Sequence, residues 1–532
     1  MFLRDNLLTL LIFFPAIGAA LVLLTRTRNA ARWLTLCFAV STLVLSLLVL
    51  AFFDWGRGDV YGYLSGDAVG TVQLVQQVDW IPSFGIRYKV GIDGLSFPLV
   101  VLTTFIFVVS CVASWNVRRM SRGYMALFLL LECGVLGTFL ALDFFLFYVF
   151  FEVSLLPMYF LIGIWGGPRK EYAAIKFFLY TLIGSIGLLV VLIGVHLCSR
   201  DVFTGGGGAA GTFDLVRLAG PEMRAFFARP ENVNTGRAFF LLAMLAFLVK
   251  VPAVPFHTWL PDAHVEAPTP MSMILAAVLL KMGGYGIFRV AYPLFPAAAK
   301  TLWMLIAIIG VVSIIYGALC AMSQIDFKRL VAYSSVSHMG FVVLGAAMMT
   351  PMSVNGAIFM MVAHGITSAM LFFIVGVIYE RVHHREMNRM GGLAGTMPIY
   401  AGFSTVAAFA NLGLPGLCGF VGEFMVLLGS FQAARGGSII MVGGASATAV
   451  YVLSIAAAFG VVLAAAYMLW TIQRVFLGRV RPEHSKLPEI TGREAAVLTP
   501  LAAMCVLLGV LPAFFVLVFT DRSVAVLIDI LR

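Results

Sequence analysis

The sequence predicts an all-α polytopic membrane protein, and three observations support that fold class. Of the 532 residues, 61% are hydrophobic and only 11% are charged, about half the charged share of a typical soluble domain. The apolar residues form continuous blocks of about 20, the length that crosses a bilayer as a helix. No polar segment is long enough to hold a separate soluble core, so we expect a single membrane domain.

The apolar blocks predict about fourteen transmembrane helices. Their centres lie near residues 16, 42, 103, 131, 154, 185, 248, 278, 310, 339, 366, 415, 460 and 507. Prolines interrupt the seventh and the twelfth helix, because proline lacks a backbone donor and clashes with the preceding turn. We therefore expect two broken helices in the bundle.

An internal repeat organises these helices. The segment AIKFFLYTLIGS at 174–185 aligns with AIFMMVAHGITS at 357–368, and this alignment places the two broken helices at corresponding positions. A shift of five helices reverses direction across the membrane, which indicates inverted repeats, and broken helices in both halves indicate a transport site. We expect N-terminal helices 1–3 at 1–115, repeats of five helices at 122–290 and 300–478, and a fourteenth helix at 495–520.

The basic residues predict the orientation. With the N-terminus outside, the loops that face inward carry most of the Lys and Arg residues, and the positive-inside rule favours this topology. These inward residues include Arg118, Arg119, Lys328, Arg474 and Arg479, whereas Arg289 and Lys300 are assigned to short outward segments. Two long loops, at about 54–90 and 198–237, are also expected outside. Both termini are therefore expected outside. The net charge of +10 reflects topology, and we predict no nucleic-acid surface.

The cysteines exclude a metal centre of the common kinds. The seven cysteines are scattered through apolar runs and form no CxxC pair, so neither a zinc site nor an iron–sulfur cluster is expected in this chain. We expect no cofactor and no metal here.

Six ionisable residues lie inside predicted helices, where a charge costs about 3 kcal/mol or more and marks a functional site by default. They are three carboxylates and three lysines: Glu132, Glu152, Glu423, Lys176, Lys250 and Lys281. One interpretation is structural ion pairs that hold helices in register. The other is a proton relay, because burial disfavours the lysine cation and a nearby carboxylate favours it.

The seventh helix carries the strongest candidate. The stretch FLVKVPAVPFHTWLPDAHVEAPTP at 247–270 places Lys250 two residues before Pro252 and five before Pro255. Irregular backbone at membrane depth survives only where it is buried in protein or lines a water-filled cavity. We therefore expect Lys250 at a broken helix with access to water. Pro415 interrupts the twelfth helix in the same way shortly before Glu423.

Histidines extend the candidate site. His338 and His364 lie in the middle of helices among hydroxyl side chains, and they are either buried packing groups or members of a proton relay. His257 and His264 are placed at or beyond the broken helix, where the prolines disrupt helical ligand spacing. Lys176 is expected to reach towards the membrane surface, and Glu132 has no marked neighbours.

Four long motifs carry a family resemblance. VKVPAVPFHTWLPDAHVEAPTPMSMILAAVLLKMGGYG, DFFLFYVFFEVSLLPMYFLIGIWGG, FKRLVAYSSVSHMGF and YKVGIDGLSFPLVVLTTF resemble the subunit M (chain 4) family, the antiporter-like membrane subunits of proton-pumping NADH:quinone oxidoreductase, or respiratory complex I. The resemblance covers essentially the whole chain and implies fourteen helices with two inverted five-helix repeats.

The resemblance also implies roles for individual residues. It pairs Glu152 on the fifth helix with Lys250 on the seventh, makes Lys281 the central lysine and makes Glu423 the terminal carboxylate. The related subunits L and N and the Mrp-type antiporter subunits generally carry lysine at this last position. We expect Lys250 and Lys281 to carry protons, Glu152 to tune Lys250, His338 and His364 to extend the relay, and Glu423 to release the proton outside.

The implied function is proton translocation in the bacterial inner membrane, driven by quinone reduction elsewhere in the complex. NADH, FMN, iron–sulfur clusters and quinone are expected in partner subunits, and subunits L and N are expected neighbours in the bilayer. One alternative is a cation/proton antiporter module of Mrp type, or the equivalent subunit of a membrane-bound hydrogenase. Another is a purely structural subunit whose buried ions only orient helices.

Overall fold

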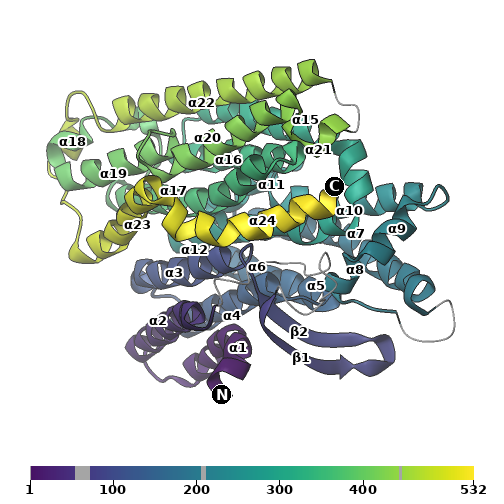
Figure 1. Ribbon diagram of the computed structural model, residues 1–532. Helices are drawn as coiled ribbons and strands as arrows, with labels where there is room; N and C mark the ends of the chain where they lie inside the picture. The colour runs from purple at the N-terminus through teal and green to yellow at the C-terminus, as the bar shows by residue number, and fades with distance from the viewer. Residues whose placement is uncertain (1, 54–71, 205–210, 443–445) are drawn as a thin grey trace.

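Fourteen helices of the described chain are long and apolar enough to cross a membrane, and they pack together in one bundle (Figure 1). The computed structural model describes residues 2–53, 72–204, 211–442 and 446–532. The candidate spans are residues 4–24, 28–52, 97–116, 121–140, 144–165, 170–203, 233–250, 269–294, 296–322, 327–348, 351–382, 418–441, 447–475 and 492–510. The predicted all-α membrane class and the predicted number of helices are confirmed.

The first half of the chain supplies eight spans and three short helices outside them. Its helices are α1 (Phe2–Leu24), α2 (Arg28–Phe52), α3 (Phe97–Ala113), α4 (Ser121–Leu140), α5 (Phe144–Val153), α6 (Leu155–Trp165), α7 (Lys170–Thr204), α8 (Leu215–Leu218), α9 (Pro221–Ala228), α10 (Val233–Lys250), α11 (Trp259–Glu266), α12 (Thr269–Ile274), α13 (Leu280–Gly286) and α14 (Tyr292–Leu294). The three short helices outside the spans are α8, α9 and α11. Two π-helical turns, 275–279 and 287–291, join α12, α13 and α14 into one continuous span.

The second half supplies the remaining spans. Its helices are α15 (Pro296–Met322), α16 (Phe327–Met348), α17 (Pro351–Val382), α18 (Leu393–Thr396), α19 (Pro398–Asn411), α20 (Cys418–Gln432), α21 (Ile439–Val442), α22 (Ala447–Val475), α23 (Gly492–Val510) and α24 (Val518–Leu531). Helices α16, α17 and α20 pack against one another, and they contribute three of the residues of the candidate site.

Both predicted helix breaks are present. α10 ends at Lys250, and the chain is not helical again until α11 begins at Trp259. α19 ends at Asn411, and α20 begins at Cys418 after a segment in which Gly413 and Gly416 adopt positive φ angles of 78° and 91°. Glycine reaches this backbone region without steric strain, so it suits the turn that reconnects the two half-helices.

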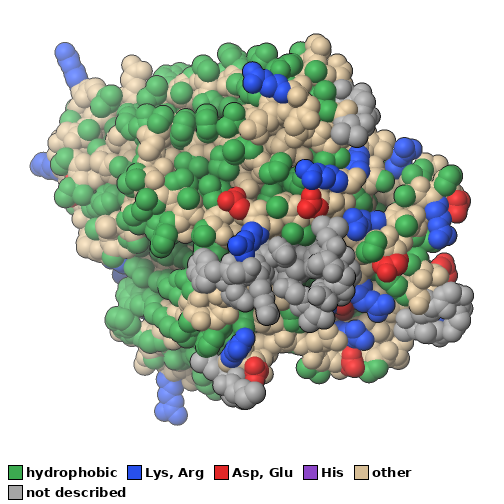
Figure 2. Space-filling model, in the orientation of Figure 1, with side chains coloured by type: hydrophobic (Ala, Val, Ile, Leu, Met, Phe, Trp, Pro, Cys, Tyr) green, Lys and Arg blue, Asp and Glu red, His purple; other side chains and the backbone are tan. Residues whose placement is uncertain are grey.

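Burial separates the centre of the bundle from its lipid-facing surface. The span α12–α14 and the central part of α17 are buried on all sides, whereas Val452, Ile455, Phe459 and Val462 of α22 are exposed. Their spacing places them on one face of the helix, as expected for contact with acyl chains. Hydrophobic side chains cover much of the face in Figure 2, and charged side chains gather at its right, near α8 and α9.

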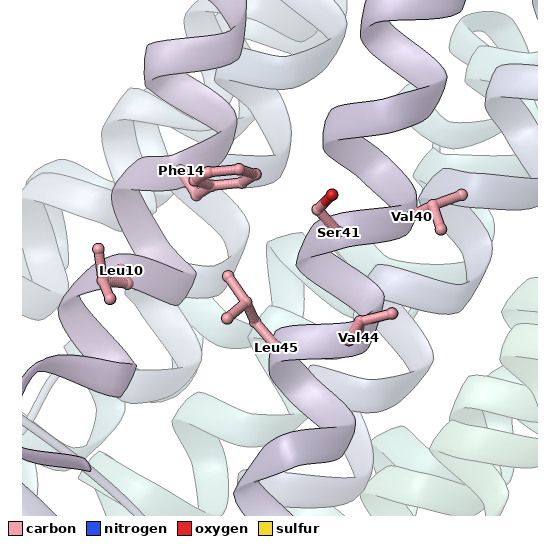
Figure 3. Close-up of a pocket in the computed structure, with 6 residues that line it drawn as sticks. All are labelled: Leu10, Phe14, Val40, Ser41, Val44 and Leu45. Carbon is pink, nitrogen blue, oxygen red and sulfur yellow. The ribbon is translucent and has the colours of Figure 1, made fainter. Parts of the chain in front are cut away.

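A groove between α1 and α2 belongs to this apolar surface (Figure 3). Its volume is about 320 Å³, and its lining consists of Leu10, Phe14, Val40, Ser41, Val44 and Leu45. The lining offers one hydroxyl and no ionisable group, so this groove does not contribute to an ion pathway.

The structure differs from the predicted elements at a hairpin and at the last predicted helix. The strands β1 (Gln73–Ile81) and β2 (Ile86–Ile92) form an antiparallel hairpin where only a loop was expected. The helix expected at 495–520 is also wrong in its extent, because α23 ends at Val510 and a second helix, α24, follows. Pro512 lacks the N–H that would continue α23, so the chain leaves the helix axis at this point.

Candidate functional site

A buried pair of nitrogen groups lies at the centre of the bundle. Nζ of Lys281 lies 2.6 Å from Nδ1 of His364 and donates to the carbonyl oxygen of Ala276 at 2.6 Å. Ala276 belongs to the π-helical turn 275–279, a feature that is frequent at functional sites. Lys281 and His364 come from α13 and α17 and are 0% and 1% exposed, so both groups are shielded from bulk solvent.

A second histidine continues from this pair. The rings of His364 and His338 have their centroids 5.7 Å apart. Nδ1 of His338 lies 2.8 Å from the carbonyl oxygen of Ser334, and Nε2 lies 2.9 Å from that of Asn411. Carbonyl oxygens only accept, and a neutral imidazole donates from only one nitrogen. The surroundings of His338 therefore complement a ring that carries protons on both nitrogens.

Glu423 ends this line of groups. Its Oε1 lies 3.4 Å from Nε2 of His338, and the two side chains are each 3% exposed. The predicted internal row is thus one chain of neighbouring groups, Lys281–His364–His338–Glu423, drawn from α13, α17, α16 and α20.

The broken twelfth helix explains how this end of the row forms. Pro415 follows Asn411 by four residues and has no N–H to occupy the Asn411 carbonyl, which is therefore free to accept from His338. A Cβ atom on Gly413 would overlap the Glu423 carboxylate, so only glycine leaves room for it. The interruption supplies both an acceptor for the histidine and space for the acid.

Glu152 and Lys250 lie near each other on α5 and α10. No hydrogen bond or ion pair within 4.0 Å joins them among the described residues, but the two groups interact electrostatically. Nζ of Lys250 lies 4.6 Å from the ring centroid of Phe151, a cation–π distance. Lys250 is 1% exposed, whereas Glu152 is half-buried, so the acid lies nearer the surface of this chain than the lysine does.

Helix packing brings Lys250 close to the helix of Lys281. A Cβ atom on Gly283 would lie 3.0 Å from Cβ of Lys250 and 2.7 Å from the carbonyl oxygen of Phe247, so glycine allows α10 and α13 to touch. Gly283 is two residues from Lys281. No hydrogen bond among the described residues connects the two lysines directly, and the close approach of their helices is made at Gly283 and Lys250.

His264 was not predicted as a site residue, yet it lies beside the row. It is completely buried in α11, stacks on Phe372 at 4.3 Å between ring centroids, and neither ring nitrogen has a hydrogen-bond partner among the described residues. It interacts electrostatically with Lys281 and Lys328. The sequence placed His264 beyond the break, but the chain resumes a helix at Trp259 and returns it to the core.

Two basic residues assigned to loops are in fact buried. Lys328 is 4% exposed and donates to the carbonyl oxygen of Ala267 at 2.6 Å, a favourable place for a cation because Ala267 ends α11. Arg289 is 2% exposed and pairs with Asp93. Both lie at helix ends that other helices cover. The positive-inside rule counts basic residues in loops and does not reveal this burial.

The remaining candidates lie away from the row. Lys176 forms an ion pair with Asp262 at 2.7 Å, and Asp262 also contacts Arg329 at 3.2 Å. Glu132 is 0% exposed, and neither of its carboxylate oxygens has a hydrogen-bond partner among the described residues. His257 packs edge-on against Tyr316. Within the described ranges, no group of three or more His, Cys, Asp or Glu residues is placed to hold a metal ion.

Two family models match the chain. One, described as NADH:quinone oxidoreductase/Mrp antiporter, TM, matches residues 141–449, and the other, described as NADH-ubiquinone oxidoreductase chain 4, amino terminus, matches residues 68–143. NADH-quinone oxidoreductase subunit M of Rhodobacter capsulatus is 42% identical over 524 residues, covering 96% of this chain and 94% of that protein.

The chain belongs to the subunit M (chain 4) family of NADH-quinone oxidoreductases.

Further relatives agree with this membership. Subunit M of Rickettsia prowazekii is 35% identical over 523 residues, covering 96% of this chain and 97% of that protein. A chain in respiratory complex I from Thermus thermophilus superposes with a TM-score of 0.82 at 29% identity, covering 99% of this chain and all of that one. A chain in the Mrp complex from Dietzia sp. superposes with a TM-score of 0.78 at 26% identity, covering 97% of this chain and 52% of that one.

Proposed function

We propose that this chain translocates protons in the membrane arm of NADH:quinone oxidoreductase, and that Lys281, His364, His338 and Glu423 carry them. The observation that supports this most strongly is the unbroken contact order of these four groups in a buried part of the bundle. Each member can hold or release a proton, and neighbouring members come from different helices. A set of structural ion pairs would instead pair each lysine with an acid.

The proposed direction of transfer runs from the Glu152–Lys250 pair to Glu423. Quinone reduction in a partner subunit changes the charge near Glu152, and this alters the proton affinity of Lys250. The proton passes to Lys281 across the contact that Gly283 permits, through water. Lys281 gives it to His364, and His338 passes it to the Glu423 carboxylate, which releases it outside.

The proposal extends to the wider assembly and to the topology of the chain. NADH, FMN, the iron–sulfur clusters and the quinone belong to partner subunits, and subunits L and N are the expected membrane neighbours. The chain lies in the bacterial inner membrane with both termini outside, and residues 122–290 and 300–478 are inverted repeats. The first repeat contributes Glu152, Lys250 and Lys281, and the second contributes His338, His364 and Glu423.

The test replaces the central lysine in the intact complex. Lys281→Met removes the ammonium and keeps most of the side-chain length, and Lys300→Met makes the same change at the end of α15, outside the row. In proteoliposomes, we expect Lys281→Met to abolish proton uptake through this subunit and Lys300→Met to behave as wild type. Normal uptake and quinone reduction in an assembled Lys281→Met complex would leave only a structural role for the buried ions.

The similarity to the Mrp complex supports a second candidate, cation/proton exchange. The carboxylate at position 423 argues against it, because Mrp-type subunits are expected to carry lysine there. Replacing Na⁺ with choline in the same proteoliposomes separates the two functions. A proton flux that requires Na⁺ would favour the antiporter.

A further inference from the structure

A polar stripe runs along the helix that carries Lys281, away from the row described above. Lys281, Tyr285 and Arg289 are four residues apart, so they share one face of the helix. All three are buried, at 0%, 1% and 2% exposure. A charged residue inside a spanning helix is costly and marks a function by default, and neither the row nor the Glu152–Lys250 pair uses Arg289.

The contacts order this stripe. Nε of Arg289 donates to the Tyr285 hydroxyl at 2.8 Å, and that hydroxyl donates to the carbonyl oxygen of Phe139 at 2.9 Å. Nη2 of Arg289 forms an ion pair with Asp93, whose side chain is 1% exposed. These contacts join Tyr285, Arg289 and Asp93. Lys281 lies four residues before Tyr285 on the same face of the helix, so the stripe extends from Lys281 to Asp93, at the end of the span that faces outside in the proposed orientation.

The far end of the stripe is rigid and covered. Asp93 lies between β2 and α3, where its carboxylate accepts from the backbone N–H groups of Leu95 and Ser96, each at 2.9 Å. A Cβ atom on Gly94 would overlap the carbonyl oxygen of Phe519, so α24 lies directly on this turn. Asp93 is held in place before it contacts Arg289, and the positive end of the pair points back towards Tyr285.

We propose that Arg289, which Asp93 positions, is an electrostatic seal that stops the proton on Lys281 from leaking outward along this stripe. Arginine keeps its proton at any accessible pH, so Arg289 cannot relay one, and its fixed charge repels an approaching proton. Arginine acts as such a barrier in other membrane pores. This inference rests on the proposed role of Lys281. With the outward stripe sealed, the proton on Lys281 transfers to His364.

The seal is tested by passive leak, which needs no turnover and so does not depend on whether the chain pumps. Proteoliposomes with the intact complex, without NADH, receive a potassium diffusion potential from valinomycin, and a trapped pH dye reports proton flux. Asp93→Asn/Arg289→Gln removes the charge without leaving a lone buried ion. We expect its leak to exceed that of wild type by about tenfold, equivalent to about 1.4 kcal/mol.

Two further variants identify the cause of the leak. Asp93→Asn alone keeps the arginine charge and is expected to leak as wild type does. Adding Lys281→Met to the leaking double variant is expected to restore the wild-type rate, because the stripe begins at Lys281. A leak that persists in this triple variant would indicate a packing defect and would overturn the proposal.

If the double variant does not assemble, a different substitution provides the test. Arg289→Lys keeps a cation, but a lysine can release its proton, so this variant is expected to leak as well. A wild-type leak in the double variant, or in Arg289→Lys, would also overturn the proposal. Failure of the proposed pumping function appears separately, as normal proton uptake in Lys281→Met during turnover.

Discussion

Neutralising Glu423 should stop proton transfer at the end of the row. The carboxylate lies 3.4 Å from Nε2 of His338, and both side chains are almost fully buried. With an effective dielectric constant of about 20, the attraction between the two charges is about 5 kcal/mol. Salt screens a buried pair only weakly, so this attraction acts whenever His338 carries the proton in transit.

Glu423→Gln removes that attraction without changing the side-chain volume. Each 1.36 kcal/mol in a barrier changes the rate tenfold, so loss of even half the attraction slows transfer by about a hundredfold. Glu423→Asp keeps the charge and is the matched control, with a smaller loss expected. The assay measures proton uptake and quinone reduction together in proteoliposomes. Wild-type uptake in Glu423→Gln would refute the assignment of Glu423 as the last member of the row.

Three further predictions concern other parts of the chain. Glu152→Gln and Lys250→Met should each lower the proton uptake coupled to quinone reduction, and Lys300→Met should leave it unchanged. Equal uptake in all three variants would show that Glu152 and Lys250 do not pass protons to the row. Arg381 donates to both Glu494 carboxylate oxygens at 3.0 and 2.8 Å and so connects α17 to α23. Glu494→Gln should therefore destabilise the complex by about 3 kcal/mol or more, as measured by thermal unfolding. An unchanged unfolding temperature would contradict this. Asp143 lies outside the spans, and burial raises its pKa from 3.8 to about 6. The protonated carboxyl is therefore favoured in the folded protein. The stability that its bound proton contributes is present below about pH 4 and is lost as pH rises through 6. Asp143→Asn keeps the helix cap and should stabilise the protein above pH 6 by about 3 kcal/mol, with a smaller gain towards pH 4; destabilisation at pH 7.5 would show that the charge itself is needed.

The helices and their breaks could be predicted because their causes are local. A block of about 20 apolar residues needs no partner to be recognised as a span, and Pro252, Pro255 and Pro415 interrupt helices through their own geometry. The row residues were visible for the same reason, since Lys281 and Glu423 are charges inside apolar sequence. Their contacts follow from the packing of four helices.

The contacts that complete the site are not local. The acceptor that Asn411 offers to His338 comes from 73 residues away, and nothing near His338 in the sequence indicates it. Arg289 and Lys328 lie at helix ends, where only the packing of other helices decides between a loop and the core. The hairpin of β1 and β2 was missed because its strands, between apolar spans, were interpreted as a long outward loop.

The most direct measurement of the central claim follows the proton at Glu423 itself. Infrared difference spectroscopy of the intact complex during turnover detects the C=O stretch of a carboxylic acid as it gains and loses a proton. We expect this band in wild type, its loss in Glu423→Gln, and its loss in Lys281→Met as well, because the proton then never reaches His364. A turnover band that remains unchanged in Lys281→Met would contradict transfer along the row.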